Sequence, residues 1–579
     1  MHTGGTSEGM DVLSKRRAQF AGPSGVKGLI QNSRIFALAV FASLGGFVYG
    51  YNQGMFGQVL NMASFNRTVN PESIKNTTTR GLLTAILELG AWVGVLINGY
   101  NADKFGRKIA TQIGVVIFMV GVIVQACAKN VDYIYGGRFV TGLGVGILSM
   151  IVPLYNAELA PAEIRGSLVS LQQLAICTGI MISYWIGYGT NYIGGTGAGQ
   201  SDAAWLVPIC IQLLPAVILG VGIIWLPQSP RWLVTRDRED QALSVLAEIR
   251  RAPRDSEIVQ LEFLEIKAQH MFEVDRSRAK FPQFQSGSFM DNLKLGFYDY
   301  ASLFTNKSLR KRVFVAIFTM VFQQWSGINA ILYYAAFIFQ DLGLTGNTTS
   351  LLASGVGGIL LMLATIPAVL YIDQLGRKPV LICGAIGMGI SHIIVAALYG
   401  AFGPTSWRGH AAAGWVAVVF VWIYQINFGY SWGPGAWVLV AEVFPLGVRA
   451  KGISIGASSN WLNNFAIGQA TPDMVKSMNY GTFIFFGIIC FLAAAFIFFM
   501  VPETKGLTLE EMDEIFGDEA GNAADDRARL DRIYTELGLM EGGDHPMNSE
   551  KMNGEKIANV DIMNAGGYKN TSFAQGTGM

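Results

Sequence analysis

The sequence has few charged residues for its length, and this scarcity excludes an ordinary soluble domain. Only 14% of its 579 residues are charged, whereas soluble proteins average about 25%. Hydrophobic residues make up 51%. They form long blocks, such as 109–127, 206–226 and 480–501, whose lengths approach the roughly 20 residues that cross a bilayer as a helix. The sequence therefore predicts a polytopic protein embedded in a lipid bilayer.

Cysteine and histidine are also scarce, which removes several further classes of function. The five cysteines lie in apolar blocks without disulfide or metal-ligand spacing, so we interpret them as packing residues. The five histidines do not cluster, so no metal site or other cofactor is expected. No nucleophile–base pattern of an enzyme is present, and a net charge of +1 argues against nucleic-acid binding. The polar, basic first 30 residues lack the apolar region of a cleavable signal peptide.

The apolar blocks divide into twelve predicted membrane spans, six on each side of a charged stretch. We therefore expect an all-α integral membrane fold with two six-helix halves. The predicted segments are an N-terminal cytoplasmic tail at 1–34, a first half at 35–226, a cytoplasmic loop with short helices at 227–312, a second half at 313–501 and a largely disordered cytoplasmic tail at 502–579.

Basic residues in the short loops predict which side faces the cytoplasm. Loops containing DKFGRK, APAEIRG, DQLGRK and PLGVRAKG fall on the same side as the charged middle stretch and both tails. The opposite loops carry N-glycosylation patterns that begin at Asn66, Asn76 and Asn347. The two signals agree, and together they predict a multi-pass plasma-membrane glycoprotein with both termini in the cytoplasm.

The two predicted halves repeat each other. GYNADKFGRK after the second span recurs as YIDQLGRK after the eighth, and YNAELAPAEIRG after the fourth recurs as VAEVFPLGVRAKG after the tenth. The matching positions are about 270–285 residues apart, which indicates a duplicated half. Solvated loop charges are the alternative for one motif, but the repetition favours cytoplasmic gate networks that hold the halves together. The candidate gate residues are Asp103, Arg107, Glu158, Arg165, Asp373, Arg377, Glu442 and Arg449.

Amide side chains recur at membrane depth, where a polar group is costly and is often functional. An amide both donates and accepts hydrogen bonds, as a sugar hydroxyl does, and an aromatic ring can cover the apolar face of a sugar. Helix packing is the alternative for any single amide, but six amides together with two tryptophans favour a site for a neutral, polyhydroxylated molecule. They are Gln173, Gln323, Gln324, Asn329, Trp437, Asn460, Trp461 and Asn464.

Several motifs resemble the sugar porter family of the major facilitator superfamily. VTGLGVGILSMIVPLYNAELAPAEIR at 140–165 is similar to the family signature, and PQSPRWL, QQWSGINAILYY, GPGAW and PETKG extend the resemblance over 35–516. The resemblance implies a monosaccharide carrier, of a fungal type, whose eight residues above bind the sugar. Gln228 stands where the family usually has glutamate. Gly358 and Gly429 replace polar residues of some hexose carriers, which leaves the preferred sugar open.

The resemblance also bears on coupling to protons. Asn52 stands where many proton-coupled members have an aspartate that faces an arginine, here Arg138. An amide cannot cycle a proton, so Asn52 favours facilitated diffusion. Glu88 in the second span keeps proton coupling open, because it could partner Arg138 and titrate; a structural ion pair or a place near the outer mouth is its alternative. A proton-coupled carrier of a sugar, sugar acid or quinate and a non-transporting sugar sensor are the rival predictions.

Two helix breaks are expected, at Gly327 and at 433–435, because glycine and proline free backbone groups that a cavity can use. In the C-terminal tail, Lys551, Lys556 and Lys569 are candidate attachment points for endocytic machinery, with solvated charges as the alternative.

Overall fold

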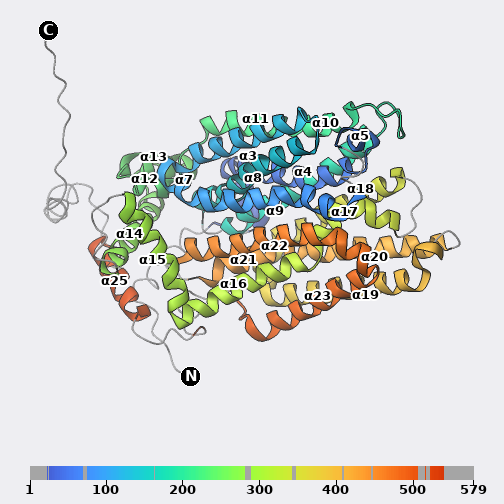
Figure 1. The fold of residues 1–579 in the computed structure, drawn as a ribbon. Helices are drawn as coiled ribbons and strands as arrows, with labels where there is room; N and C mark the ends of the chain where they lie inside the picture. Colours follow the sequence, from blue (N-terminus) through green and yellow to red (C-terminus); the bar gives the residue numbers. More distant parts are fainter. Residues whose placement is uncertain are drawn as a thin grey trace, which may run out of the picture.

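A computed structural model gives the architecture of the chain. It describes residues 22–23, 25–69, 75–161, 164–280, 289–341, 347–406, 410–444, 448–505, 516 and 522–539. Within those ranges the regular elements are helices. Most of them run along one common direction as two adjacent groups, and a smaller set gathers at one end (Figure 1).

The first group is the N-terminal half. It begins with the short α2 (Gly25–Gln31), and α5 (Ala63–Val69) lies between its first two spans. Its spans are formed by α3 (Ser33–Ala42) with α4 (Leu44–Val59), α7 (Thr77–Ala126), α8 (Val131–Leu159), α9 (Arg165–Thr190), and α10 (Ala203–Ile211) with α11 (Leu213–Gly222) and the 3-10 turn η2 (Ile223–Trp225). Helix α7 supplies the second and third spans.

The second group is the C-terminal half. Its helices are α16 (Lys307–Trp325), α17 (Ile328–Asp341), α18 (Asn347–Leu375), α19 (Arg377–Ser406), α20 (Ala411–Tyr430), α21 (Trp432–Val443), α22 (Arg449–Met478) and α23 (Gly481–Met500). Eleven segments of the described chain are long and apolar enough to cross a membrane. Helix α22 is not among them because it carries polar residues such as Asn460 and Asn464, yet it packs against α7 and α16. With α22 the architecture contains twelve spans, as predicted.

Apolar side chains at the periphery have the exposure that a bilayer requires. Leu214 on α11 and Phe499 on α23 are 63% and 78% exposed. In water such surfaces would favour association, whereas lipid tails cover them without cost. The polar residues of the spans are instead buried between helices.

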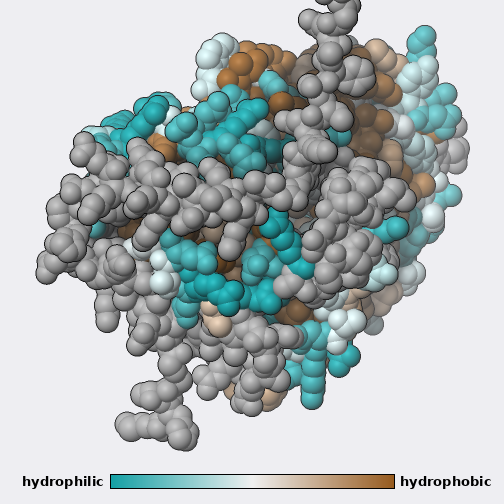
Figure 2. Space-filling view, turned by 90° about the vertical axis from the view of Figure 1, so that its left-hand side faces the viewer, coloured by the Kyte–Doolittle hydropathy of each residue, from teal (hydrophilic) through white to brown (hydrophobic). Residues whose placement is uncertain are grey.

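The loop helices and the C-terminal segment form one cluster at the end that carries the basic loops. The loop contributes α12 (Pro230–Val234), α13 (Glu239–Arg250), α14 (Glu257–Lys280) and α15 (Phe289–Thr305), and the C-terminal segment contributes α25 (Asn522–Glu536). Figure 2 views this end, where hydrophilic side chains gather near the centre and hydrophobic ones lie along a flank.

The predicted disorder of the C-terminal tail is wrong for residues 522–539. Leu530 and Ile533 lie on one face of α25 and pack with Phe263 and Leu264 of α14. Arg529 also pairs with Asp275 of α14, 3.6 Å apart. The polar composition of this segment concealed a narrow apolar stripe, which suffices to attach a short helix to a neighbouring apolar surface.

One of the two predicted helix breaks falls where the sequence placed it. Gly327 separates α16 from α17. Its φ of +97° lies in a region that residues other than glycine rarely adopt. The second break lies at Ser431, two residues before the Gly433–Pro434–Gly435 run. The run itself forms the first turn of α21, where the missing N–H of proline needs no partner.

Candidate functional site

A chain of amide side chains crosses the middle of the C-terminal half and reaches the N-terminal half. Gln323, in the last turn of α16, donates to the carbonyl of Trp432 at 2.8 Å and accepts from Asn460 at 2.6 Å. Gln324 donates to Gln323 at 3.3 Å and accepts from Asn329. The break at Gly327 allows residues on both sides of it to face the same space. Four predicted site residues are therefore joined in one network.

Gln53 of α4 and Tyr333 of α17 extend this network, and the sequence analysis did not identify either. Gln53 donates to Asn329 at 2.5 Å and to the Tyr333 hydroxyl at 3.3 Å. The Tyr333 hydroxyl lies 2.6 Å from Glu88 and 3.0 Å from Asn464. Gln53 follows Asn52 directly, so its amide at membrane depth was a detectable signal; Tyr333 is not distinguishable from a packing tyrosine by sequence alone.

The remaining predicted site residues lie near the same interface between halves. The Gln173 amide donates to Cys177 at 3.6 Å and lies close to Gly433. The Trp461 ring stacks at a tilt, 5.1 Å from the Tyr49 ring. Its indole N–H is buried and has no partner within the described structure. Trp437 is partly buried against apolar residues of both halves. Each of these side chains thus lies within the predicted region.

Asn52 and Arg138, the two positions of the coupling hypothesis, each bond to other partners. Asn52 donates to Gln212 of the sixth span at 2.8 Å. Arg138 donates to the carbonyl of Thr84 at 2.9 Å, and its guanidinium lies 3.6 Å from the Phe56 ring centre. The Asn52 side chain thus bonds at the junction of α10 and α11, and Phe56, one turn later on α4, is the α4 residue that meets the Arg138 guanidinium.

Glu88 is fully buried and its contacts differ from both predicted alternatives. It makes no ion pair with Arg138 among the described side chains, and it does not lie exposed at the outer mouth. Instead, it contacts Tyr333 and Asn464 of the opposite half.

The ends of the two halves that lie opposite the loop helices are in contact. Thr77 and Thr78, at the start of α7, bond to Asp473 of α22, and Gln469 donates to the carbonyl of Thr78 at 3.0 Å. Deeper in the membrane, the Tyr184 hydroxyl of α9 donates to the carbonyl of Leu332 at 2.6 Å. The structure is therefore closed on the side opposite the loop helices.

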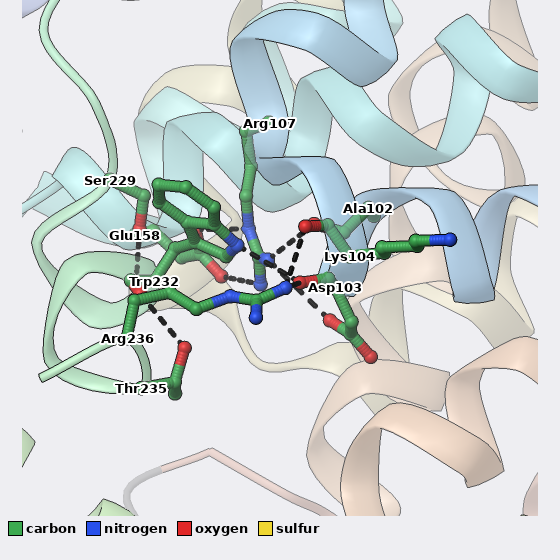
Figure 3. A network of polar contacts seen from close by, with 9 residues as sticks. All are labelled: Ala102, Asp103, Lys104, Arg107, Glu158, Ser229, Trp232, Thr235 and Arg236. Carbon is green, nitrogen blue, oxygen red and sulfur yellow. Dashed lines mark hydrogen bonds and ion pairs between the residues drawn. The ribbon is translucent and has the colours of Figure 1, made fainter. Parts of the chain in front are cut away.

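The charged motif of the first half forms a network around Arg107 (Figure 3). Two guanidinium nitrogens of Arg107 meet both Glu158 carboxylate oxygens, at 2.8 and 2.6 Å. A third donates to the Ala102 carbonyl at 2.9 Å, and Asp103 lies 3.5 Å away. The Trp232 indole donates to the Asp103 carbonyl at 3.0 Å, which ties α12 to this turn. This network lies within the N-terminal half.

The second half repeats the arrangement. Arg377 pairs with Glu442 at 2.7 Å, and Thr504 donates to the same carboxylate at 2.6 Å. The Glu503 carboxylate accepts from backbone N–H groups of Arg377 and Lys378, at 2.9 and 3.0 Å. Burial raises the pKa of Glu503, but backbone N–H donors outweigh it, so the pKa lies below its ordinary value.

The structure describes the side chains of some, but not all, of the remaining candidate gate and glycosylation residues. Arg165 donates to the Ala160 carbonyl at 3.4 Å, and Arg449 donates to the Phe444 carbonyl at 3.2 Å, five residues earlier in both cases. Asn66 lies half-buried in α5, and exposed Asn76 caps α7. Asn347 begins α18 and Asp373 lies near its end, but both fall outside the residues whose side chains are described.

The fold and site together define a membrane carrier of two six-helix halves. Residues 38–516 match the family described as sugar (and other) transporters, and the chain belongs to that family within the major facilitator superfamily. It is a transporter of that superfamily and not an enzyme.

Relatives and solved structures agree with this assignment. A probable quinate permease of Aspergillus niger is 34% identical and aligns over 89% of this chain and 95% of its own length. A glucose transporter, mfs1, of Aspergillus flavus is 32% identical over 87% and 94%. The proton:xylose symporter XylE, an Escherichia coli protein, with 6-bromo-6-deoxy-D-glucose bound, is 29% identical over 84% and 99%, with a TM-score of 0.67.

Proposed function

We propose that this protein carries a neutral monosaccharide, a hexose or a pentose, across the plasma membrane by alternating access and facilitated diffusion. The continuous amide network from Gln53 to Asn460 carries this proposal. Each amide offers both a donor and an acceptor, so the network can exchange its internal hydrogen bonds for bonds to sugar hydroxyls. The buried, unpartnered indole N–H of Trp461 adds a donor, and its ring adds an apolar face.

Alternating access is supported by the contacts that join the halves at the site. Gln53 of the first half bonds to Asn329 of the second, and Asn329 belongs to α17, which also makes the Tyr184–Leu332 contact between the halves. A sugar that replaces these hydrogen bonds would contact both halves, so its affinity would depend on how the halves are positioned. A ligand shifts a conformational equilibrium only through such a difference in affinity. The ionic networks at Arg107 and Arg377 brace the cytoplasmic ends of each half and serve as gates in this proposal.

Facilitated diffusion is supported by the surroundings of Asn52. Its partner Gln212 is also an amide, so this pair has no group that changes protonation in the physiological range. The position at which a proton would be carried in the symporters of the resemblance is therefore occupied by two neutral side chains. The sugar gradient alone then drives transport.

Transport of a sugar acid such as quinate is the second candidate. The Nε and one Nη of buried Arg138 have no partner within the described structure, and such a guanidinium suits a carboxylate. Against this candidate, the Arg138 guanidinium bonds to the Thr84 carbonyl and covers the Phe56 ring, and neither contact belongs to the amide network.

Competition for uptake separates the two candidates. Cells without their own hexose carriers would express the protein and take up labelled glucose or xylose. We expect saturable uptake that excess unlabelled monosaccharide inhibits and that equimolar quinate leaves unchanged. Uptake of labelled quinate, competed by quinate and not by monosaccharides, would replace the neutral-sugar proposal with the sugar-acid one.

We also propose that the protein is a fungal plasma-membrane glycoprotein with cytoplasmic termini. The loop helices and α25 lie together at one end, and α5, which carries Asn66, lies at the other (Figure 1). Asn76 caps the start of α7, next to the Thr77–Asp473 contact on the side opposite the loop helices. The Asn76 side chain uses its oxygen to cap α7, which leaves its nitrogen available for a glycan. Recognition of the tail lysines by endocytic machinery remains part of this proposal.

A further inference from the structure

Glu88 belongs to the N-terminal half, but its hydrogen bonds go to the C-terminal half. Its side chain is fully buried in α7. One carboxyl oxygen lies 2.6 Å from the Tyr333 hydroxyl of α17, and the other lies 3.2 Å from the Asn464 amide nitrogen of α22. The Tyr333 hydroxyl and the Asn464 amide oxygen are 3.0 Å apart. The three side chains therefore form a closed ring across the interface.

Whether Glu88 is ionised or protonated decides how many protons are available for hydrogen bonds in this ring. A tyrosine hydroxyl has one proton to donate, yet Tyr333 lies within hydrogen-bond distance of two oxygens, on Glu88 and Asn464. If Glu88 is a carboxylate, one of these oxygens has no proton between it and the hydroxyl. If Glu88 is a carboxylic acid, it donates to Tyr333, Tyr333 donates to Asn464, and Asn464 donates back to Glu88. The neutral acid alone satisfies all three contacts.

The charged, titratable and amide groups around Glu88 come from several helices. Tyr333 of α17, Tyr49 of α4 and Arg138 of α8 face Glu88, and α22 presents the amide of Asn464. Arg138 would stabilise an ionised Glu88, but no ion pair joins the two among the described side chains, and two Arg138 nitrogens have no hydrogen-bond partner there. Glu88 instead bonds to a tyrosine and an amide.

We propose that Glu88 is a proton-binding residue that closes the outer gate. In the closed state it holds a proton and locks α7 to α17 and α22. When the outer side opens, Tyr333 and Asn464 move away with their half, and Glu88 releases the proton and turns to Arg138. This inference rests on the proposed function. In a carrier that works by facilitated diffusion the proton returns to the outer side, so external pH sets the rate of uptake but not the final sugar distribution.

The test compares uptake of labelled hexose across external pH from about 5 to about 9 in the wild type and in Glu88→Gln. Glutamine can donate to Tyr333 and accept from Asn464, so it preserves the ring without titrating. We expect the wild-type rate to fall several-fold toward alkaline pH and the rate of Glu88→Gln to vary by less than about twofold. Glu88→Leu, which removes the ring, should lower uptake by about tenfold at every pH.

The control is Asp202→Asn, which removes an exposed outer acid far from the ring, next to Arg67. It should retain the pH profile of the wild type. Equal pH profiles for the wild type and Glu88→Gln would overturn the proposal. So would loss of uptake in Glu88→Gln equal to that in Glu88→Leu, at matched surface abundance, because an ionised carboxylate would then be required.

A second measurement does not depend on the transported molecule. The infrared difference spectrum between purified wild type and Glu88→Gln should contain the C=O band of a protonated carboxyl group at neutral pH. Carboxylate bands alone would contradict the inference. If neither wild type nor variant takes up any monosaccharide, the proposed function fails, whereas this spectrum still decides the protonation of Glu88.

Discussion

Replacement of Gln323 by leucine is expected to reduce kcat/KM for sugar uptake by about tenfold or more. The change removes a hydrogen-bond partner from three buried groups, the Trp432 carbonyl and the amides of Asn460 and Gln324, and a lost partner costs about 1–3 kcal/mol. It also removes a donor and an acceptor from the proposed sugar site. Initial rates over a range of sugar concentrations, normalised to surface abundance, would measure the effect.

Asn427→Leu provides a matched control for this substitution. Asn427 is also an amide at membrane depth, on α20, but it donates to the carbonyl of Ile423 in its own helix. Its loss should alter stability slightly and leave the apparent affinity for sugar unchanged. If Gln323→Leu and Asn427→Leu reduce uptake to the same extent, the amides act in helix packing and the proposed site is wrong.

Replacement of Arg107 by alanine is expected to remove most transport and most of the folded protein. Arg107 and Glu158 are both nearly buried, with side chains 10% and 6% exposed. Removal of one partner from such a pair leaves an uncompensated charge and costs about 3–5 kcal/mol. Since native proteins are stable by only about 5–15 kcal/mol, surface abundance and thermal stability in detergent should both fall.

Two further substitutions show whether this effect is specific. Arg377→Ala removes the corresponding arginine of the second half and should resemble Arg107→Ala, because Arg377 also pairs with the glutamate at the repeated position of its half, Glu442. Arg236→Ala removes an exposed arginine that donates to the carbonyls of Asp103 and Lys104 in the same network. It should cost little. Full activity of Arg107→Ala would show that the network is a set of solvated loop charges.

The sequence predicted which polar residues lie together better than it predicted their hydrogen-bond partners. Gln323, Asn329 and Asn460 were identifiable because amides are costly in a membrane, and they do lie together. Tyr333 was missed because a tyrosine in an apolar span is ordinary. The partner of Asn52 was also missed, because Gln212 lies 160 residues away and their contact depends on how two helices are rotated.

The fold was predictable for a related reason. The bilayer requires every span to be a long apolar helix, so the spans can be recognised along the whole sequence. The basic loops then indicate the side on which each span ends, and the repeat indicates the two halves. The position of the second break could not be read as accurately, because proline is compatible with the first turn of a helix as well as with its interruption. Attachment of α25 depended on an apolar surface of α14 that is distant in sequence, so the composition of the tail alone indicated disorder.

The central claim is that a neutral monosaccharide crosses through this protein without a coupled ion, and uptake into liposomes tests it most directly. Purified protein would be reconstituted, labelled hexose added outside, and internal sugar followed with no ion gradient and then with an imposed proton gradient. We predict uptake that stops when internal and external concentrations are equal, in both conditions. Accumulation above the external concentration under the proton gradient would contradict the account.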